Sequence, residues 1–113
     1  MEIVLGNGQA QLRAFADAGG QVLFGTDVGY MTDFDPTDEY VYMQQAGLSF
    51  RQILAALTTA PAERFGLAAQ TGRLVRGLGA DIVVADGDPE RDIRNLAKVR
   101  YTFRRGRMIY QRS

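Results

Sequence analysis

The segment Gln21-Val22-Leu23-Phe24-Gly25-Thr26-Asp27 decides the fold. An apolar run with a polar end is typical of a short buried strand. Before it, residues 9–18 predict a helix with Leu12, Phe15 and Ala16 on one face, and Gly19-Gly20 ends that helix. A helix, a glycine turn and a buried strand make half of a βαβ repeat. The order therefore predicts an α/β fold with a parallel sheet.

Three further helices are expected downstream. Asp35 as N-cap and Pro36 at the first helical position predict a helix that runs to Ala46. Residues 49–52 match a capping box, and the helix that follows carries an apolar stripe. Pro61 begins another short helix, which Gly66 ends. The stripe consists of Phe50, Ile53, Leu54 and Leu57.

After Gly66 the apolar pattern changes from a period near 3.6 toward a period of 2, which indicates strands. Four strands are expected, and their alternation predicts a half-exposed antiparallel sheet. The change divides the chain into a helix-rich part, 1–66, and a strand-rich part, 67–113. The expected strands are 73–76, 81–86, 99–103 and 107–110.

The composition excludes several kinds of site. The chain has 113 residues, which suits one domain at most and is too short for a complete (β/α)₈ barrel of roughly 200 residues or more. Because it has no Cys, disulfides, thiolate zinc sites and thiol nucleophiles are excluded. Because it has no His, Ser-His-Asp triads and histidine-ligated metal sites are also excluded. Catalysis by this chain alone would depend on carboxylates, hydroxyls, Arg and one Lys.

The net charge of zero hides an asymmetry. Residues 1–60 carry two basic and seven acidic side chains, a net charge of −5, and residues 61–113 carry eleven and six, a net charge of +5. A basic half can bind nucleic acid. Here acidic residues interrupt the arginines, so solvated faces, or attraction between the halves, explain the pattern better.

The sequence predicts a cytoplasmic protein that neither enters a membrane nor binds nucleic acid. No run approaches the ~20 apolar residues of a membrane span. The first eight residues lack the basic start and long apolar core of a signal peptide. Without cysteine, nothing in the chain is adapted to an oxidising compartment.

The segment Gly25-Thr26-Asp27-Val28-Gly29 is the candidate chemical site. An Asp between glycines at the carboxyl end of a buried parallel strand sits where α/β folds place ligands and metals. The alternative is an Asp that only caps a loop.

The order of motifs resembles the carboxyl-terminal portion of amidohydrolase-superfamily enzymes, particularly imidazolonepropionase-like and prolidase-like members. Gly25-Thr26-Asp27 matches the end of the family's last barrel strand. Residues 53–66 resemble its "alxaaTxnPAxxxG" helix pair, and residues 71–84 its "GxixxGxxADxvv" hairpin. Asp88-Pro89 and then residues 99–110 correspond to its final strands, so the resemblance covers about residues 20–111.

This resemblance implies the last βα elements of a metal-dependent (β/α)₈ barrel in 1–66, followed by strands of a small antiparallel β-sandwich domain in 67–113. It implies hydrolysis or deamination at carbon–nitrogen bonds, with a divalent metal, zinc by expectation, in the full-length enzyme. Asp27 corresponds to the Asp that ligates the metal and takes the proton of the hydrolytic water. Thr26 and the loop after Gly29 would line the substrate pocket.

The family's other metal ligands are mainly histidines, with a Lys or Glu, on strands upstream of this region. Since one Asp cannot hold a catalytic transition metal, which takes three or more protein ligands, we expect no metal on this chain alone. The sequence thus predicts a carboxyl-terminal fragment that is inactive in isolation. An orphaned barrel strand exposes its edges, so a homodimer or larger homo-oligomer is expected.

Two other interpretations stay open at this point. In one, the chain is a non-catalytic oligomerising or interaction module. In the other, it is a subunit that completes a barrel in trans. Nucleic-acid binding through the carboxyl-terminal arginines is the least favoured, because there is neither an aromatic-rich platform nor a recognition-helix motif.

Overall fold

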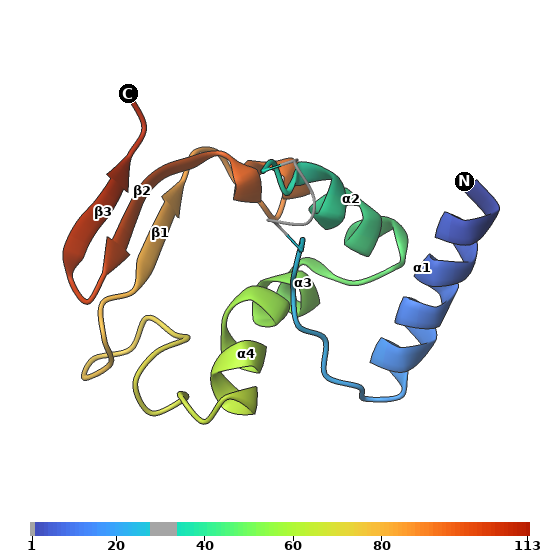
Figure 1. Ribbon diagram of the computed structural model, residues 1–113, viewed down its shortest axis with the longest axis horizontal. Helices are drawn as coiled ribbons and strands as arrows, with labels where there is room; N and C mark the ends of the chain where they lie inside the picture. Colours follow the sequence, from blue (N-terminus) through green and yellow to red (C-terminus); the bar gives the residue numbers. More distant parts are fainter. Residues whose placement is uncertain (1, 28–33) are drawn as a thin grey trace.

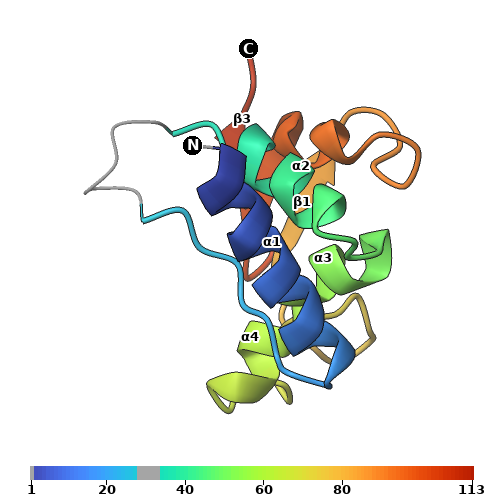
Figure 2. The same cartoon turned by 90° about the vertical axis from the view of Figure 1, so that its right-hand side faces the viewer.

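The computed structural model describes residues 2–27 and 34–113, as a helical part with a small sheet at one end (Figure 1). The sheet is antiparallel, in the order β1-β2-β3. Helix α1 lies at the opposite end of the molecule from the sheet (Figures 1 and 2). The elements are α1 (Glu2–Asp17), α2 (Thr37–Gln45), α3 (Phe50–Leu57), α4 (Thr59–Arg64), β1 (Ile82–Ala85), a 3₁₀ helix η1 (Ile93–Ala97), β2 (Val99–Arg104) and β3 (Arg107–Gln111).

The four helices lie where the sequence predicts helical structure, with changes at their ends. Helix α1 begins well before residue 9 and continues through Gly6 and Gly8. Helix α2 begins one residue after Pro36, whereas Asp35 accepts hydrogen bonds from the amide and hydroxyl of Thr37 at 3.0 and 2.5 Å. Asp35 therefore supports the start of α2 from one position further out than an N-cap.

Helix α3 has the predicted capping box. The Ser49 hydroxyl accepts from the amide of Gln52 at 3.2 Å, and the Gln52 side chain accepts from the amide of Ser49 at 2.8 Å. These two bonds satisfy backbone donors that a helix start otherwise leaves without partners.

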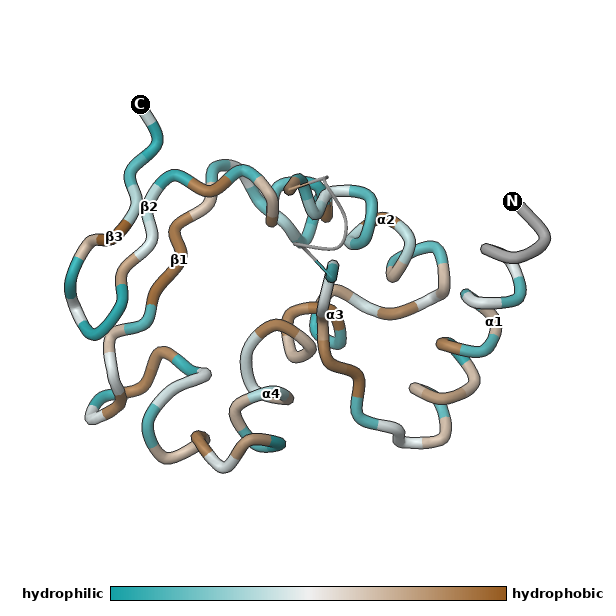
Figure 3. Tube along the Cα trace, viewed as in Figure 1, coloured by the Kyte–Doolittle hydropathy of each residue, from teal (hydrophilic) through white to brown (hydrophobic). Residues whose placement is uncertain are grey.

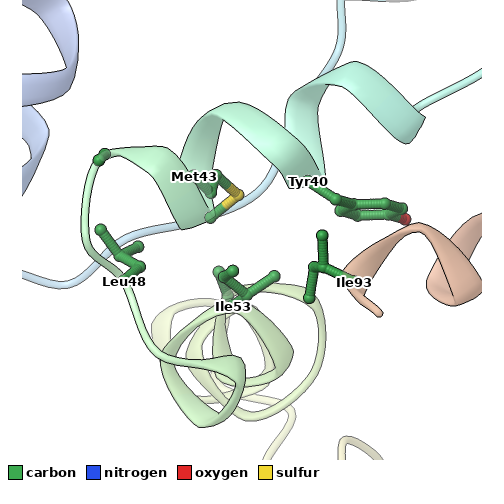
Figure 4. Packing of buried hydrophobic residues seen from close by; sticks show 7 residues of the cluster. Tyr40, Met43, Leu48, Ile53 and Ile93 are labelled. Carbon is green, nitrogen blue, oxygen red and sulfur yellow. The ribbon is translucent and has the colours of Figure 1, made fainter. Parts of the chain in front are cut away.

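The core is a small apolar cluster between α2, α3 and η1 (Figure 4). Ile53 of α3 and Ile93 of η1 are the largest fully buried side chains, with 0% and 1% of their surface exposed. Met43 of α2 lies above Ile53, whereas the Tyr40 ring lies beside Ile93 (Figure 4). The predicted stripe of α3 is only partly buried, because Leu54 remains 38% exposed.

Residues 21–27 are extended, but the predicted parallel sheet is absent from the described residues. Val22, Phe24 and Thr26 are half-buried and alternate with exposed neighbours. The Phe24 amide donates to the carbonyl of Ala56 at 3.0 Å, and its ring stacks on Tyr40 with centroids 5.0 Å apart. The prediction of a strand is wrong for this structure, because helices flank the segment and no described strand pairs with it.

The other three predicted strands form the sheet. The β2–β3 hairpin turns through Arg105 and Gly106, whose φ angles of 50° and 77° are both left-handed, and Arg104 pairs with Arg107 across it. Two consecutive left-handed residues match the twist of a tight hairpin.

The prediction of a strand at 73–76 is wrong. These residues lie in an irregular loop between Gly72 and Gly77, whose φ angles are 103° and 96°, and Leu74 is 78% exposed. A Cβ on Gly72 would come within 2.8 Å of the Cβ of Ala62. The chain therefore turns closely around α4 here instead of extending along the sheet.

The molecule is open for its size. Its exposed surface is 8425 Å², against the ~6,100 Å² expected for a compact monomer of this mass. Its radius of gyration is 15.0 Å, against the ~13 Å of a compact domain of this length. Within residues 2–27 and 34–113, no helix is long and apolar enough to cross a membrane.

We predict that Ile53→Ala lowers the free energy of unfolding by about 2–5 kcal/mol, because it leaves a cavity in the centre of the core. Urea denaturation followed by circular dichroism measures the loss. Leu54→Ala is the matched control on the same helix, and a loss at Leu54 equal to that at Ile53 would contradict the described core.

We predict that Ser49→Ala costs about 1 kcal/mol, because the amide of Gln52 loses its acceptor. Ser49→Asp keeps an oxygen acceptor and should retain the stability of the unmodified chain. The same denaturation experiment compares the two variants, and equal stabilities would show that the capping box contributes nothing.

Candidate functional site

Asp27 lies at the end of the extended segment 21–27, as the sequence predicts. It is exposed, and its φ of 56° places it in the left-handed region, where Asp is better tolerated than most residues. Thr26 precedes it and is half-buried. The contacts of Phe24 with Ala56 and Tyr40 hold the segment against α3 and α2. The segment is thus anchored to the helices, and Thr26 and Asp27 lie next to each other at its end.

The third predicted site residue, Gly29, lies outside the described residues. Its expected contribution to a substrate pocket stays a prediction.

The described residues do not form a metal site by themselves. Among them, no group of three His, Cys, Asp or Glu side chains lies close enough together to hold an ion. Asp27 supplies one carboxylate, whereas a catalytic zinc site takes three protein ligands.

Asp81 is a structural carboxylate. It accepts hydrogen bonds from the Thr71 hydroxyl at 2.7 Å and from the Arg105 amide at 2.8 Å. These bonds, the one from Arg105 foremost, lower the pKa of Asp81 below its usual value. Asp81 thereby joins the loop after α4 to the tip of the β2–β3 hairpin, a role that the sequence reasoning missed.

Asp86 has a similar role at the other end of the sheet. Its carboxylate pairs with Arg100 at 2.8 Å and with Arg112. Hydrogen bonds from these two guanidinium groups, Arg100 first, lower the pKa of Asp86. The same contact raises the pKa of Arg100. Asp81 and Asp86 are therefore occupied in holding the sheet together.

An apolar groove of about 1150 Å³ separates the sheet from α3 and α4. Residues of β1 and α3 line it, and Figure 3 shows that much of both elements is hydrophobic. Its lining includes Leu54, Phe65, Leu74, Val83 and Ile109, which are each 38% exposed or more. These exposed apolar side chains are the kind that pack against further protein.

Comparison with known proteins identifies the family. Residues 4–110 match the family model described as "Amidohydrolase family". The chain belongs to the amidohydrolase family.

Solved structures of amidohydrolases share the fold of this chain. A Xaa-Pro dipeptidase with methionine bound in its active site superposes with a TM-score of 0.83 at 25% identity, over 92% of this chain and 25% of the dipeptidase. A prolidase complexed with N-methylphosphonate-L-proline gives a TM-score of 0.82 at 29% identity, over 93% of this chain and 26% of the prolidase.

The curated protein "Amidohydrolase tasK" of Hapsidospora irregularis is 46% identical over 43 residues, which are 38% of this chain and 4% of that protein. This amidohydrolase chain therefore spans about a quarter of the length of the similar solved structures and a small part of the curated relative. The resemblance inferred from the order of the motifs is confirmed, and it lies with prolidase-like members of the family.

The lowered pKa of Asp81 gives the stability of this amidohydrolase chain a pH dependence. A carboxyl whose pKa is lower in the folded chain stabilises it fully above the unfolded pKa of about 3.9 and loses this effect as the pH falls through the folded value. Asp35 and Asp86 act in the same direction. We predict that Asp81→Asn removes part of the loss of stability seen below about pH 4.

Urea denaturation at a series of pH values measures this dependence. Glu90→Gln is the control, since the Glu90 side chain is exposed and forms no ion pair within the described part of the chain. If Asp81→Asn left the acid limb unchanged, the hydrogen bonds from Thr71 and Arg105 would have no energetic consequence.

Proposed function

We propose that this chain is the carboxyl-terminal part of a metal-dependent amidohydrolase that cleaves carbon–nitrogen bonds in amides, cyclic amides or peptides. The match to the amidohydrolase family over residues 4–110, with Asp27 at the end of an extended segment, carries the proposal. The similar solved structures include a Xaa-Pro dipeptidase and a prolidase, whose names place their activity on bonds of this kind.

In this proposal residues 1–66 supply the last βα elements of a (β/α)₈ barrel, and residues 67–113 supply strands of a small β-sandwich domain. Segment 21–27 pairs with no strand among the described residues, and in a complete barrel it would have neighbouring strands to pair with; its alternating burial is compatible with that arrangement. The three-stranded antiparallel sheet supports the second part. In the described residues, β1–β3 form one layer, so the other layer of a sandwich would come from elsewhere.

Asp27 has two roles in the complete enzyme under this proposal. Its carboxylate would be one ligand of a divalent metal, zinc by preference, and would accept the proton of the attacking water. A metal bound there would lower the pKa of that water. Thr26, next to Asp27, contacts the substrate, and Gly29 belongs to the same pocket.

The isolated chain is inactive under this proposal. The described residues supply one metal ligand, and a catalytic site takes three, so the remaining ligands would come from chain outside these 113 residues.

A second candidate function is that of an interaction module. The excess of exposed surface and the open apolar groove favour it. The two functions are compatible, because a segment that completes a barrel is also an interaction surface.

The proposal is tested in a chimera in which this chain replaces the matched quarter of the prolidase. We predict that Asp27→Asn lowers the rate of dipeptide hydrolysis by roughly 10²–10⁴-fold, the range for loss of a general base. Asp38→Asn, an exposed carboxylate on α2, is the control and should leave the rate unchanged.

Metal content is measured in both variants. Full activity of the Asp27→Asn chimera would contradict the role of Asp27. The 113-residue chain assayed alone should not hydrolyse a dipeptide with zinc present. Hydrolysis that stops on chelation and in Asp27→Asn would contradict its inactivity.

A further inference from the structure

The extended segment 21–27 packs on the helices through one of its two faces. Val22, Phe24 and Thr26 are half-buried, whereas Asp27 and the residues between these three are exposed. Val22 and Phe24 pack against the core cluster of the helices. These contacts join residues of the described part of the chain, so they do not depend on protein outside it.

Phe24 makes the contacts that fix the covered face. Its amide donates to the carbonyl of Ala56 in α3 at 3.0 Å, which is the one backbone hydrogen bond of the segment within the described part of the chain. Its ring stacks on the Tyr40 ring of α2, with centroids 5.0 Å apart and planes inclined by 27°. This is an attractive arrangement for two aromatic rings. The Phe24 peptide is therefore held from the side of the helices.

Tyr40 is a firm support for the Phe24 ring. It is 7% exposed and belongs to the buried cluster, where its ring lies beside Ile93 (Figure 4). Close packing in a protein interior holds a side chain in one rotamer. The orientation of the Phe24 ring is thus set by a side chain whose own position is fixed by the core.

Asp27 follows Phe24 by three residues of extended chain, which span about 10 Å. Over that length a tilt of roughly 6° at Phe24 displaces Asp27 by about 1 Å. Catalytic groups must be held to within about 0.5 Å, and an error of about 1 Å lowers a rate by up to about 10²-fold. A small change in the stack is therefore large on the scale of catalytic geometry.

We propose that Tyr40 is a positioning residue for Asp27, because its ring, stacked on Phe24, sets the direction in which segment 21–27 presents the carboxylate. The inference rests on the proposed function, which gives Asp27 a reaction to serve. Tyr40 does not contact the reacting groups in this proposal, and it acts through Phe24. The core of the helices thereby takes part in the alignment of the site.

The test uses the chimera with the prolidase, in which Asp27→Asn is the reference variant. Tyr40→Leu keeps an apolar side chain but removes the ring, and we expect kcat to fall roughly 10–10²-fold while KM changes little. Phe24→Leu removes the other ring of the stack and should have the same effect. Tyr40→Phe keeps the stacked ring and should retain the rate.

A double variant separates positioning from a loss of stability. In the Asp27→Asn background, Tyr40→Leu should lower the rate no further, because residues that act through one group are not additive. Leu48→Ala is the control, since Leu48 belongs to the same cluster and lies on the other side of Ile53 from Tyr40 (Figure 4). It should lower the midpoint of urea denaturation and leave kcat unchanged where the chimera is folded.

Hydrogen exchange on the 113-residue chain measures the same contact without activity. The Phe24 amide bonds to Ala56, and the Ile53 amide bonds to the carbonyl of Ser49 within α3. Tyr40→Leu should speed exchange at Phe24 more than at Ile53, because local release of a segment opens its own amides first. Leu48→Ala should not favour Phe24 in this way.

The outcomes separate this inference from the proposed function. A rate that falls in both leucine variants, is retained in Tyr40→Phe and Leu48→Ala, and falls no further in the double variant supports the positioning role. A normal rate in Tyr40→Leu, with Asp27→Asn slow, overturns this inference alone. A normal rate in Asp27→Asn overturns the proposed function and this inference with it.

Two further results would leave Tyr40 with a purely structural role and overturn the inference. One is a fall in kcat in Leu48→Ala equal to that in Tyr40→Leu. The other is an additive effect of Tyr40→Leu in the Asp27→Asn background, because Tyr40 would then act on the rate without Asp27.

Discussion

The arrangement of the molecule depends on the buried contact of η1 with the helices. Among the described buried residues, Ile93 alone comes from the part of the chain that carries the sheet, and it lies in one cluster with Ile53 and Tyr40. The helices and the sheet are therefore held together largely through one short 3₁₀ helix. Between them the structure leaves the apolar groove.

The sequence predicted best those features whose causes are local. The capping box at Ser49 and Gln52 depends on residues three apart, and the β2–β3 hairpin depends on its own turn. The extended segment 21–27 was placed correctly but not as a strand, since a strand needs a neighbour and none is described. The strand predicted at 73–76 is absent for the same reason. The sequence did not predict the burial of Ile93, because its short 3₁₀ helix gives a single local signal. That signal is the Asp92 side chain, which accepts a hydrogen bond from the Arg94 amide at 3.1 Å.

The candidate site likewise has features that the sequence predicts and features that only the structure reveals. Asp27 was predicted from its position after an apolar run and from the order of the family motifs, and its role stays a prediction, whereas the family is shown by the match over residues 4–110. Asp81 lies within one of those motifs, yet its function is structural. Its partner Arg105 is 24 residues away, and only the three-dimensional structure brings the two together. Single-residue patterns do not report such pairings.

The left-handed backbone at Asp27 constrains which side chains that position accepts. With a φ of 56°, glycine, asparagine and aspartate are tolerated, whereas a β-branched or longer side chain is disfavoured. Conformation and chemistry thus select the same small set of residues. An aspartate at this position therefore satisfies the backbone whether or not it takes part in a reaction, so its presence alone is a weaker sign of catalysis than a residue that the backbone does not favour.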